Sequence, residues 1–204
     1  MRFCLLVLFF VSAVSAGCAT ANAKLVQLDL KVFKNTDTNE LVFEGKPTKI
    51  TDGDTITLAE IIKIRMNGID APESKQRCLD ENDKEYNCGA LATEHLKQII
   101  DKDKVRCTMH KYDRYGRFIM TCRKPNGEDI HAQMVRDGYA VISTYDPELY
   151  LAEEQYAREN KRGIWRGKFR HPHCFRHQKK QDWTVPNLCE NNKYYPDSPA
   201  IQPQ

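Results

Sequence analysis

The chain has 204 residues, of which 41% are hydrophobic and 29% are charged. This is the size and composition of one ordinary globular domain with extensions. Its core is expected to bury about two-thirds of the unfolded chain's surface, which excludes any need of a metal simply to fold. The formal net charge of +3 does not by itself indicate a nucleic-acid partner.

Residues 1–23 have the pattern of a secretory signal peptide. Arg2 gives a positive start, residues 5–14 form a short apolar run, and residues 21–23 (Ala-Asn-Ala) form a small-residue cleavage pattern. The sequence therefore predicts a protein that is secreted, or periplasmic or in the cell envelope, once this peptide is removed. An alternative is a bacterial lipoprotein, in which a lipid on Cys18 would anchor the chain to a membrane.

Residues 24–45 are expected to form an extension before the main domain. Apolar and polar residues alternate over residues 26–32, which is typical of a strand, and we expect it to be an added edge strand. Two further strands are predicted at residues 48–51 and 55–58. An Asp-Gly bend separates them, and there Asp54 can point into a cleft.

The next predicted strand, residues 61–69, ends at a rigid exit. Its apolar residues alternate with polar ones, so they occupy one face while Arg65 lies on the other. Pro72 cannot donate a ladder hydrogen bond and makes the residue before it extended. Asp70 and Glu73 therefore lie at the strand exit, where loops carry function.

A loop, residues 74–87, is expected to form a mobile rim over this exit, held by its cysteines. A helix is predicted from Gly89, because apolar residues recur at helical spacing on one face. The residues of this face are Ala92, Leu96, Ile99 and Ile100.

Residues 105–123 are predicted to form a β-hairpin whose tip is the Asp-Arg-Tyr-Gly sequence at 113–116. Arg117 lies at the base of the tip. A regular hairpin about this tip places Cys107 opposite Cys122, and a bulge would change that register.

Two shorter helices are expected after the hairpin. The first covers residues 129–137, a strand-like segment follows at 139–144, and the second helix begins at Pro147 and ends at Gly163. The second helix would bury Leu149, Ala152, Tyr156 and Ala157. Trp165 is expected to pack back onto the strands.

The C-terminal segment, residues 169–204, is predicted to be basic at first and then an irregular tail rich in Pro and Asn. Over residues 158–180 nine Lys or Arg residues stand against the single Glu159, which suits a polyanion or, equally, a solvated helix end. Four residues of this segment are zinc ligands by type: His171, His173, Cys174 and His177. An exported chain with a nearby Cys189 favours a disulfide at Cys174 over zinc.

Six of the eight cysteines follow the signal peptide, and an even number in an exported chain indicates disulfides. The nearest-neighbour pairs are Cys78–Cys88, Cys107–Cys122 and Cys174–Cys189. They are the favoured arrangement among the 15 connectivities that six cysteines allow.

The acidic and basic residues at these turns suit attack on a phosphodiester. Asp54, Asp70 and Glu73 offer hard oxygen ligands to a hard cation such as Ca²⁺. Arg65 and Arg117 offer guanidinium forks, which match phosphate oxygens. Taken singly, each motif is also an ordinary turn or a solvated strand residue, so the argument depends on their combination.

Three motifs in this order resemble the staphylococcal nuclease (thermonuclease) family. They are Asp-Gly-Asp-Thr at 52–55, Arg-x4-Asp-Ala-Pro-Glu at 65–73 and Asp-Arg-Tyr-Gly-Arg at 113–117. The resemblance implies an α+β domain over residues 46–168, built as a five-stranded OB-fold barrel with three helices packed on it.

The resemblance also assigns a cation site. Asp54 and Asp70 match the family's two calcium-binding carboxylates. The third protein ligand would be the main-chain carbonyl of Ala71, so the side chain at that position should matter little.

The remaining roles implied by the resemblance are catalytic and nucleotide-binding. Arg65 and Arg117 match residues that grip the scissile phosphate, and Glu73 matches the residue that positions or deprotonates the attacking water. The nucleotide-contacting residues would be Arg114, Tyr115 and Tyr145. Ser143 stands where the family has its second nucleotide-facing tyrosine, so base stacking should be weaker or rearranged here.

The resemblance therefore implies a secreted, calcium-dependent nuclease that cuts DNA and RNA with low sequence specificity and leaves 3′-phosphates. No obligate protein partner is inferred. The alternative is a non-catalytic OB-fold module that only binds nucleic acid. The presence of both aspartates and both arginines favours the enzyme.

Overall fold

The structure is a computed structural model that describes residues 29–177. The predicted signal peptide, Cys18, Cys189 and the end of the predicted tail lie outside the described residues. Within residues 29–177, no helix is long and apolar enough to cross a membrane.

A seven-stranded sheet forms the body of the protein, in the order β1-β2-β9-β10-β5-β4-β3. The strands are β1 (Leu30–Lys34), β2 (Leu41–Gly45), β3 (Pro47–Asp52), β4 (Thr55–Leu58), β5 (Ile62–Met66), β9 (Val105–Tyr112) and β10 (Phe118–Arg123). Only the pair β5–β10 is parallel; the other neighbours in this sheet are antiparallel. The predicted edge strand is β1, which lies a few residues later than expected.

The two strands β2 and β3 act as the arms of one bent strand. Only Lys46 separates them, yet β2 pairs with β9 while β3 pairs with β4 on the far side of the sheet. The chain itself thus joins two sides of the sheet, although the ladder of hydrogen bonds stays open. This mixed α+β arrangement agrees with the predicted OB-fold barrel. The strands β1 and β2 lie within the predicted extension, before residue 46, and Phe43 of β2 is part of the main core. The extension is therefore part of the folded domain.

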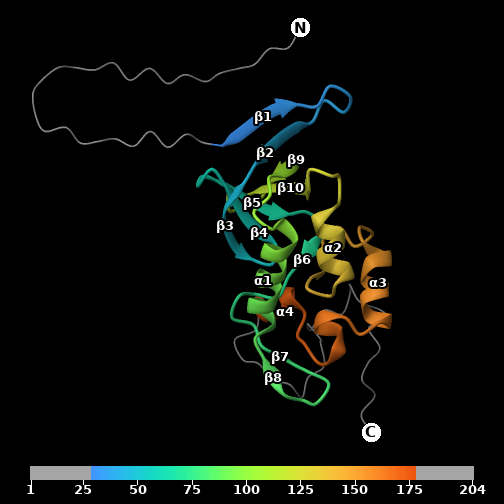
Figure 1. Cartoon of the computed structure of the whole chain (residues 1–204). Helices are drawn as coiled ribbons and strands as arrows, with labels where there is room; N and C mark the ends of the chain where they lie inside the picture. The colour runs from blue at the N-terminus through green and yellow to red at the C-terminus, as the bar shows by residue number, and fades with distance from the viewer. Residues whose placement is uncertain (1–28, 178–204) are drawn as a thin grey trace, which may run out of the picture.

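The helix α1 (Cys88–Ile100) matches the predicted helix. Asn87 caps it by accepting the Ala90 N–H, and the predicted apolar face is buried against the sheet. The helix α2 (Ile130–Arg136) also forms as predicted, with Asp129 as its cap. Figure 1 shows α1 in front of the strands and α2 beside it, next to α3 (Leu151–Glu159).

The expected start of the third helix at Pro147 is wrong. The helix α3 begins at Leu151, because Tyr150 adopts a positive φ of 63° and the four residues before Leu151 form turns. Ala152 is exposed rather than buried, and Leu149 is 40% exposed. A carboxylate takes the inner position instead: Glu154 is 3% exposed and accepts the Ile142 N–H at 2.9 Å.

The loop of residues 74–87 is more structured than predicted. It contains the short antiparallel pair β7 (Cys78–Leu79) and β8 (Glu85–Tyr86), and its Leu79 exchanges two backbone hydrogen bonds with Lys168. A small second core forms here, at the opposite end of the molecule from β1 (Figure 1). Trp165 packs on this second core, with its ring 4.8 Å from that of Phe169, and not on the barrel as expected.

Two predicted disulfides, Cys78–Cys88 and Cys107–Cys122, are present. The hairpin does contain a bulge: the register shifts between Ile119 and Met120, and beyond that shift Cys107 faces Cys122. Cys174 is also disulfide-bonded, and Cys189, its predicted partner, lies outside the described residues.

His131 is a buried hub that the sequence analysis did not identify. Its Nε2 accepts the Cys122 N–H at 2.8 Å and its Nδ1 lies 2.8 Å from the Asn67 carbonyl, so the ring is a neutral tautomer with Nδ1–H as donor. It links α2 to β10 and to the turn after β5. Burial lowers the pKa of His131 below its usual value of 6.5.

This histidine predicts an acid-sensitive fold. As the pH falls below about 6.5, the unfolded chain takes up a proton that the native imidazole resists, so the free energy of unfolding should decrease. His131→Gln should lose part of this dependence and cost about 1–3 kcal/mol at pH 7.5, because buried backbone groups lose partners. Urea unfolding between pH 5 and 8 measures both. The control is His110→Gln, because His110 is exposed. If the pH dependence were lost in His110→Gln and kept in His131→Gln, the assignment to His131 would be contradicted.

Candidate active site

Three neighbouring strands position the basic residues of the site. Arg65 of β5 is paired with Thr55 of β4 on one side and with Ile119 of β10 on the other. Arg117 directly precedes β10, which begins at Phe118. The charges of both arginines reach Asp52, the last residue of β3.

The exit of Asp70 from the sheet is fixed by pairing and by close packing. Asp70 belongs to β6 (Ile69–Asp70), which pairs with β11 (Val141–Ile142). Before it, Gly68 has a positive φ of 76° and its carbonyl accepts the Ser143 N–H at 2.9 Å. The Leu149 side chain lies against this glycine, where a Cβ atom would be 2.8 Å from it. Leu149, which was predicted to lie in the third helix, thus covers the turn that leads to Asp70.

Asp54 and Ala71 are in direct contact. The Asp54 carboxylate is buried, and its Oδ2 accepts the Ala71 N–H at 2.7 Å while its Oδ1 accepts the Thr55 hydroxyl at 3.1 Å. Gly53 makes this approach possible, because a Cβ atom there would lie 2.7 Å from the Ala71 side chain and 2.9 Å from that of Ala92. Glycine is therefore required next to Asp54.

Arg65 joins the two buried aspartates. Its Nη1 pairs with Asp54 Oδ1, and its Nη2 lies 2.7 Å from Asp70 Oδ1. Burial alone would raise the pKa of Asp70, but the Arg65 guanidinium and then Arg176 hold that pKa below its usual value. Asp52 behaves differently, because burial raises its pKa despite the nearby Arg65. The ion pairs thus keep Asp70 charged at neutral pH.

The turn that carries Glu73 is held by a buried glutamine that the sequence analysis missed. Gln76 is fully buried, its Oε1 accepts the Glu73 N–H at 3.1 Å, and its Nε2 donates to the Arg170 carbonyl at 2.6 Å. Gly89 at the start of α1 touches the same turn, since a Cβ atom there would overlap the Glu73 carbonyl. A buried Gln in a loop without periodicity gave no sequence signal.

Arg176 is the second residue of the site that the sequence analysis did not single out. It belongs to α4 (Pro172–His177) and makes a bidentate pair with Asp70, with both distances 2.9 Å. Its Nη1 also lies 2.9 Å from Glu73 Oε1. Asp70 and Glu73 therefore flank one guanidinium group. Arg176 was only one of the charges counted in the basic C-terminal segment.

Arg117 is held at the hairpin tip by Asp113. Asp113 accepts the Arg117 Nε–H at 2.7 Å and also the backbone N–H groups of Tyr115 and Arg117 at 2.9 Å. The exposed Tyr115 ring lies near two guanidinium groups, 4.9 Å from that of Arg114 and 5.6 Å from that of Arg117. Tyr145, the other predicted nucleotide contact, is also exposed.

A family model described as "Staphylococcal nuclease homologue" matches residues 63–167, just over half of the chain. The chain belongs to the staphylococcal nuclease family. The matched stretch includes Arg65, Asp70, Glu73 and Arg117, whereas Asp54 precedes it and Arg176 follows it. The predicted family and OB-fold are therefore confirmed.

Named relatives agree with this family. "Succinoglycan biosynthesis protein ExoI" of Rhizobium meliloti is 37% identical over 124 residues, which are 60% of this chain and 64% of that protein. "Uncharacterized endonuclease" of Escherichia coli O157:H7 is 34% identical, over 59% of this chain and 76% of its own. "Micrococcal nuclease" of Shigella flexneri is 31% identical, over 60% of this chain and 74% of its own. The chain thus spans less than two thirds of the first relative and more of the other two. The family and the two nuclease names support a phosphodiester hydrolase.

The oxygen atoms at this site suit the cation that the family binds. Asp54 and Asp70 supply buried carboxylates on either side of Arg65, and Ala71 adjoins both, so hard oxygen donors suited to Ca²⁺ are gathered here. Within residues 29–177 no three His, Cys, Asp or Glu side chains form a cluster that could hold a metal ion by themselves. Guanidinium groups occupy the space between the carboxylates.

Many charges of the predicted basic C-terminal segment are paired with acids in the described residues. Five of the seven Lys and Arg residues between 158 and 177 pair with acids: Arg158, Arg162, Arg166, Lys168 and Arg176. Most of these acids, such as Asp83 and Asp137, come from distant parts of the sequence. Counting charges along the chain could not anticipate them.

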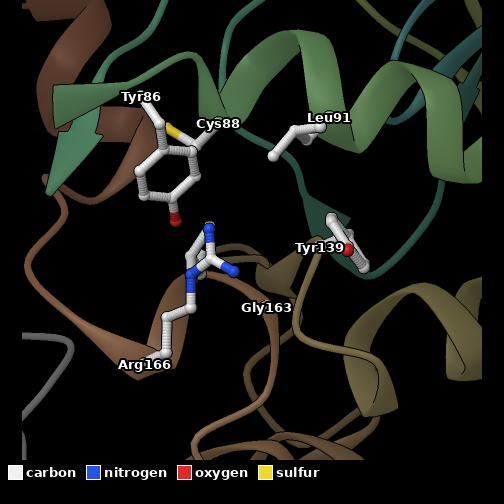
Figure 2. A pocket seen from close by; sticks show the side chains of 7 residues that line it. Tyr86, Cys88, Leu91, Tyr139, Gly163 and Arg166 are labelled. Atoms are coloured by element: carbon white, nitrogen blue, oxygen red, sulfur yellow. The ribbon is translucent and has the colours of Figure 1, made fainter. Parts of the chain in front are cut away.

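A small pocket of this family member lies away from the carboxylates. Figure 2 shows it between β8, the start of α1 and the segment that carries Arg166, whose guanidinium lies 4.6 Å from the Tyr86 ring centre. Its volume of about 10 Å³ accommodates no more than roughly one water molecule. A nucleotide cannot enter it, so the candidate active site is the carboxylate cluster around Arg65 and not this pocket.

The two site arginines should differ in their effect on stability. Arg65→Ala leaves two buried aspartates without their shared partner and should cost about 3–5 kcal/mol in chelator. Arg117→Ala breaks a more accessible pair and should cost about 1 kcal/mol or less. Urea unfolding gives the free energy of unfolding of both variants, and so compares loss of an arginine at a buried pair with its loss at a more accessible pair. Equal costs would show that Arg65 does not carry the buried charges.

Proposed function

We propose that this protein is a secreted, calcium-dependent nuclease that hydrolyses DNA and RNA with low sequence specificity and leaves 3′-phosphates. The observation that supports it is the buried cluster Asp54–Arg65–Asp70, which comes from the β3–β4 turn, β5 and β6, with Glu73 beside it. These residue types occur in the order of the family's motifs, within a chain whose family is established.

Asp54, Asp70 and the main-chain carbonyl of Ala71 would hold the cation. Bound there, Ca²⁺ would polarise a phosphoryl oxygen and offset the charge that develops on it. Arg65 lies between these two acids and reduces their repulsion. The same acids keep the Arg65 guanidinium in place, ready to contact the scissile phosphate.

Arg117 would hold the phosphate from the hairpin side. Its bond to Asp113 uses the Nε–H group, so the two terminal nitrogens of the fork remain to face a phosphate. Glu73 would accept a proton from the attacking water or orient it for in-line attack. Arg65 and Arg117, whose charges both reach Asp52, together with Glu73 would give the donors and the acceptor that such a displacement needs.

The exposed aromatic residues would carry the nucleotide. Tyr115 offers a flat face that Arg114 and Arg117 hold in place, and stacking on such a face tolerates any base. Tyr145 is 76% exposed and would replace the tyrosine that the family has at Ser143. Both features favour low sequence specificity.

The decisive assay compares cleavage of single- and double-stranded DNA and RNA in millimolar calcium and in chelator. We expect cleavage only with calcium, and Asp54→Asn should lower the rate roughly a hundredfold or more by removing a buried cation ligand. Asp103→Asn, an exposed aspartate away from the site, is the matched control. Binding without cleavage by the wild type would favour the non-catalytic module instead. Cleavage by the Asp54→Asn variant at the wild-type rate would refute the cation site.

Export is a separate proposal, supported by the signal-peptide pattern and by the disulfides, which persist in oxidising compartments. The mature protein should begin near Lys24, as N-terminal sequencing of protein from its native compartment would show. A lipid on Cys18 would identify the membrane-anchored form. An intact Met1, or free thiols at Cys78 and Cys107, would contradict export.

A further inference from the structure

The C-terminal helix α4 lies over the candidate active site but beyond the part of the chain that matches the family model, which ends at residue 167. It is attached to the domain at several points. Lys168 shares two backbone hydrogen bonds with Leu79, and the Arg170 carbonyl accepts from the buried Gln76. His171 is 7% exposed and Cys174 is buried and disulfide-bonded. Arg176 is therefore presented to the site by an anchored segment.

Arg176 occupies the oxygen atoms that a cation would need. A carboxylate oxygen has two lone pairs, and Asp70 Oδ1 accepts from both Arg65 and Arg176 while Oδ2 accepts from Arg176. On Asp54, Oδ1 is likewise taken by Thr55 and Arg65. Without Arg176, Asp70 would regain one lone pair on each oxygen. The Arg176 guanidinium is thus the group whose removal would open Asp70.

The same guanidinium also engages Glu73. Its Nη1 lies 2.9 Å from Asp70 Oδ1 and 2.9 Å from Glu73 Oε1. One guanidinium group thereby binds both the proposed cation ligand Asp70 and the proposed water-activating carboxylate of Glu73. Its side chain is about one-third exposed, so it borders solvent. Arg65, in contrast, is 15% exposed and stays between both aspartates.

We propose that Arg176 is a built-in competitor of the divalent cation. Its positive charge fills the space between Asp70 and Glu73 in the free protein, and cation binding displaces it. The two compete for Asp70, because Arg176 takes one lone pair on each of its oxygens and two positive charges at one carboxylate repel each other. The C-terminal segment therefore sets the cation concentration at which the site becomes active. This inference rests on the proposed calcium-dependent function.

The test measures calcium affinity directly, by titration calorimetry of the full chain. Arg176→Ala should bind calcium about tenfold more tightly than wild type, a change typical of two linked ligands. Arg176→Lys keeps the charge but cannot bridge both carboxylates, so its affinity should lie between the two. Lys168→Ala is the matched control, since it removes one charge of the same segment that pairs with the exposed Asp83 instead. It should leave the affinity unchanged.

Nuclease assays at varied calcium give the second readout. Arg176→Ala should need correspondingly less calcium for half-maximal activity, while kcat at saturating calcium should stay within about twofold of wild type. Thermal unfolding in chelator checks that the variants fold. If Arg176→Ala does not fold, the comparison of Arg176→Lys with wild type still decides the matter.

The outcomes separate this inference from the proposed function. Calcium binding that is lost in Asp70→Asn but equal in wild type and both Arg176 variants would overturn the competitor role and leave the cation site intact. Unchanged affinity with a large fall in kcat would also overturn it, and would make Arg176 a substrate contact. No calcium binding by any variant, or binding that survives Asp70→Asn, would refute the cation site itself.

Discussion

The structure depends on keeping two carboxylates, Asp54 and Asp70, charged and close together inside the protein. Both are 3% exposed, and burying even one unpaired carboxylate costs several kcal/mol. Arg65 meets that cost by pairing with both, and its position on β5 follows from the pairing with β4 and β10. The barrel can therefore be understood as a frame that holds a guanidinium between two acids.

Close backbone contacts make this frame accurate. Gly53 allows the Asp54 turn to touch Ala71 and α1, and Gly89 allows α1 to touch the Glu73 turn. Gln76 then satisfies the polar groups that this approach buries, and it joins them to the C-terminal segment. The site and the segment that carries Arg176 are therefore one hydrogen-bonded unit.

Patterns with a short period allowed the sequence to predict much of this. Alternation located β4 and β5, helical spacing located α1, and the order of the acidic and basic motifs indicated the residues around Arg65. Contacts between distant segments could not be predicted in this way. Gln76, His131 and Arg176 are polar residues whose importance comes from partners far along the chain. The predicted start of α3 was wrong for a local reason, because the sequence gives no signal for the positive φ of Tyr150.

The bend at Lys46 has a consequence for how the chain folds. The strand β2 pairs locally with β1 through the connection at residues 35–40 and non-locally with β9, where Phe43 lies opposite Cys107. Closing a long loop costs more chain entropy than closing a hairpin, so we expect the hairpins β1–β2, β4–β5 and β9–β10 to form before the seam between β2 and β9. The Cys107–Cys122 disulfide fixes β9 to β10 at that seam. Oxidation of this one pair would thus present a ready-made edge onto which the first strands of the chain can dock.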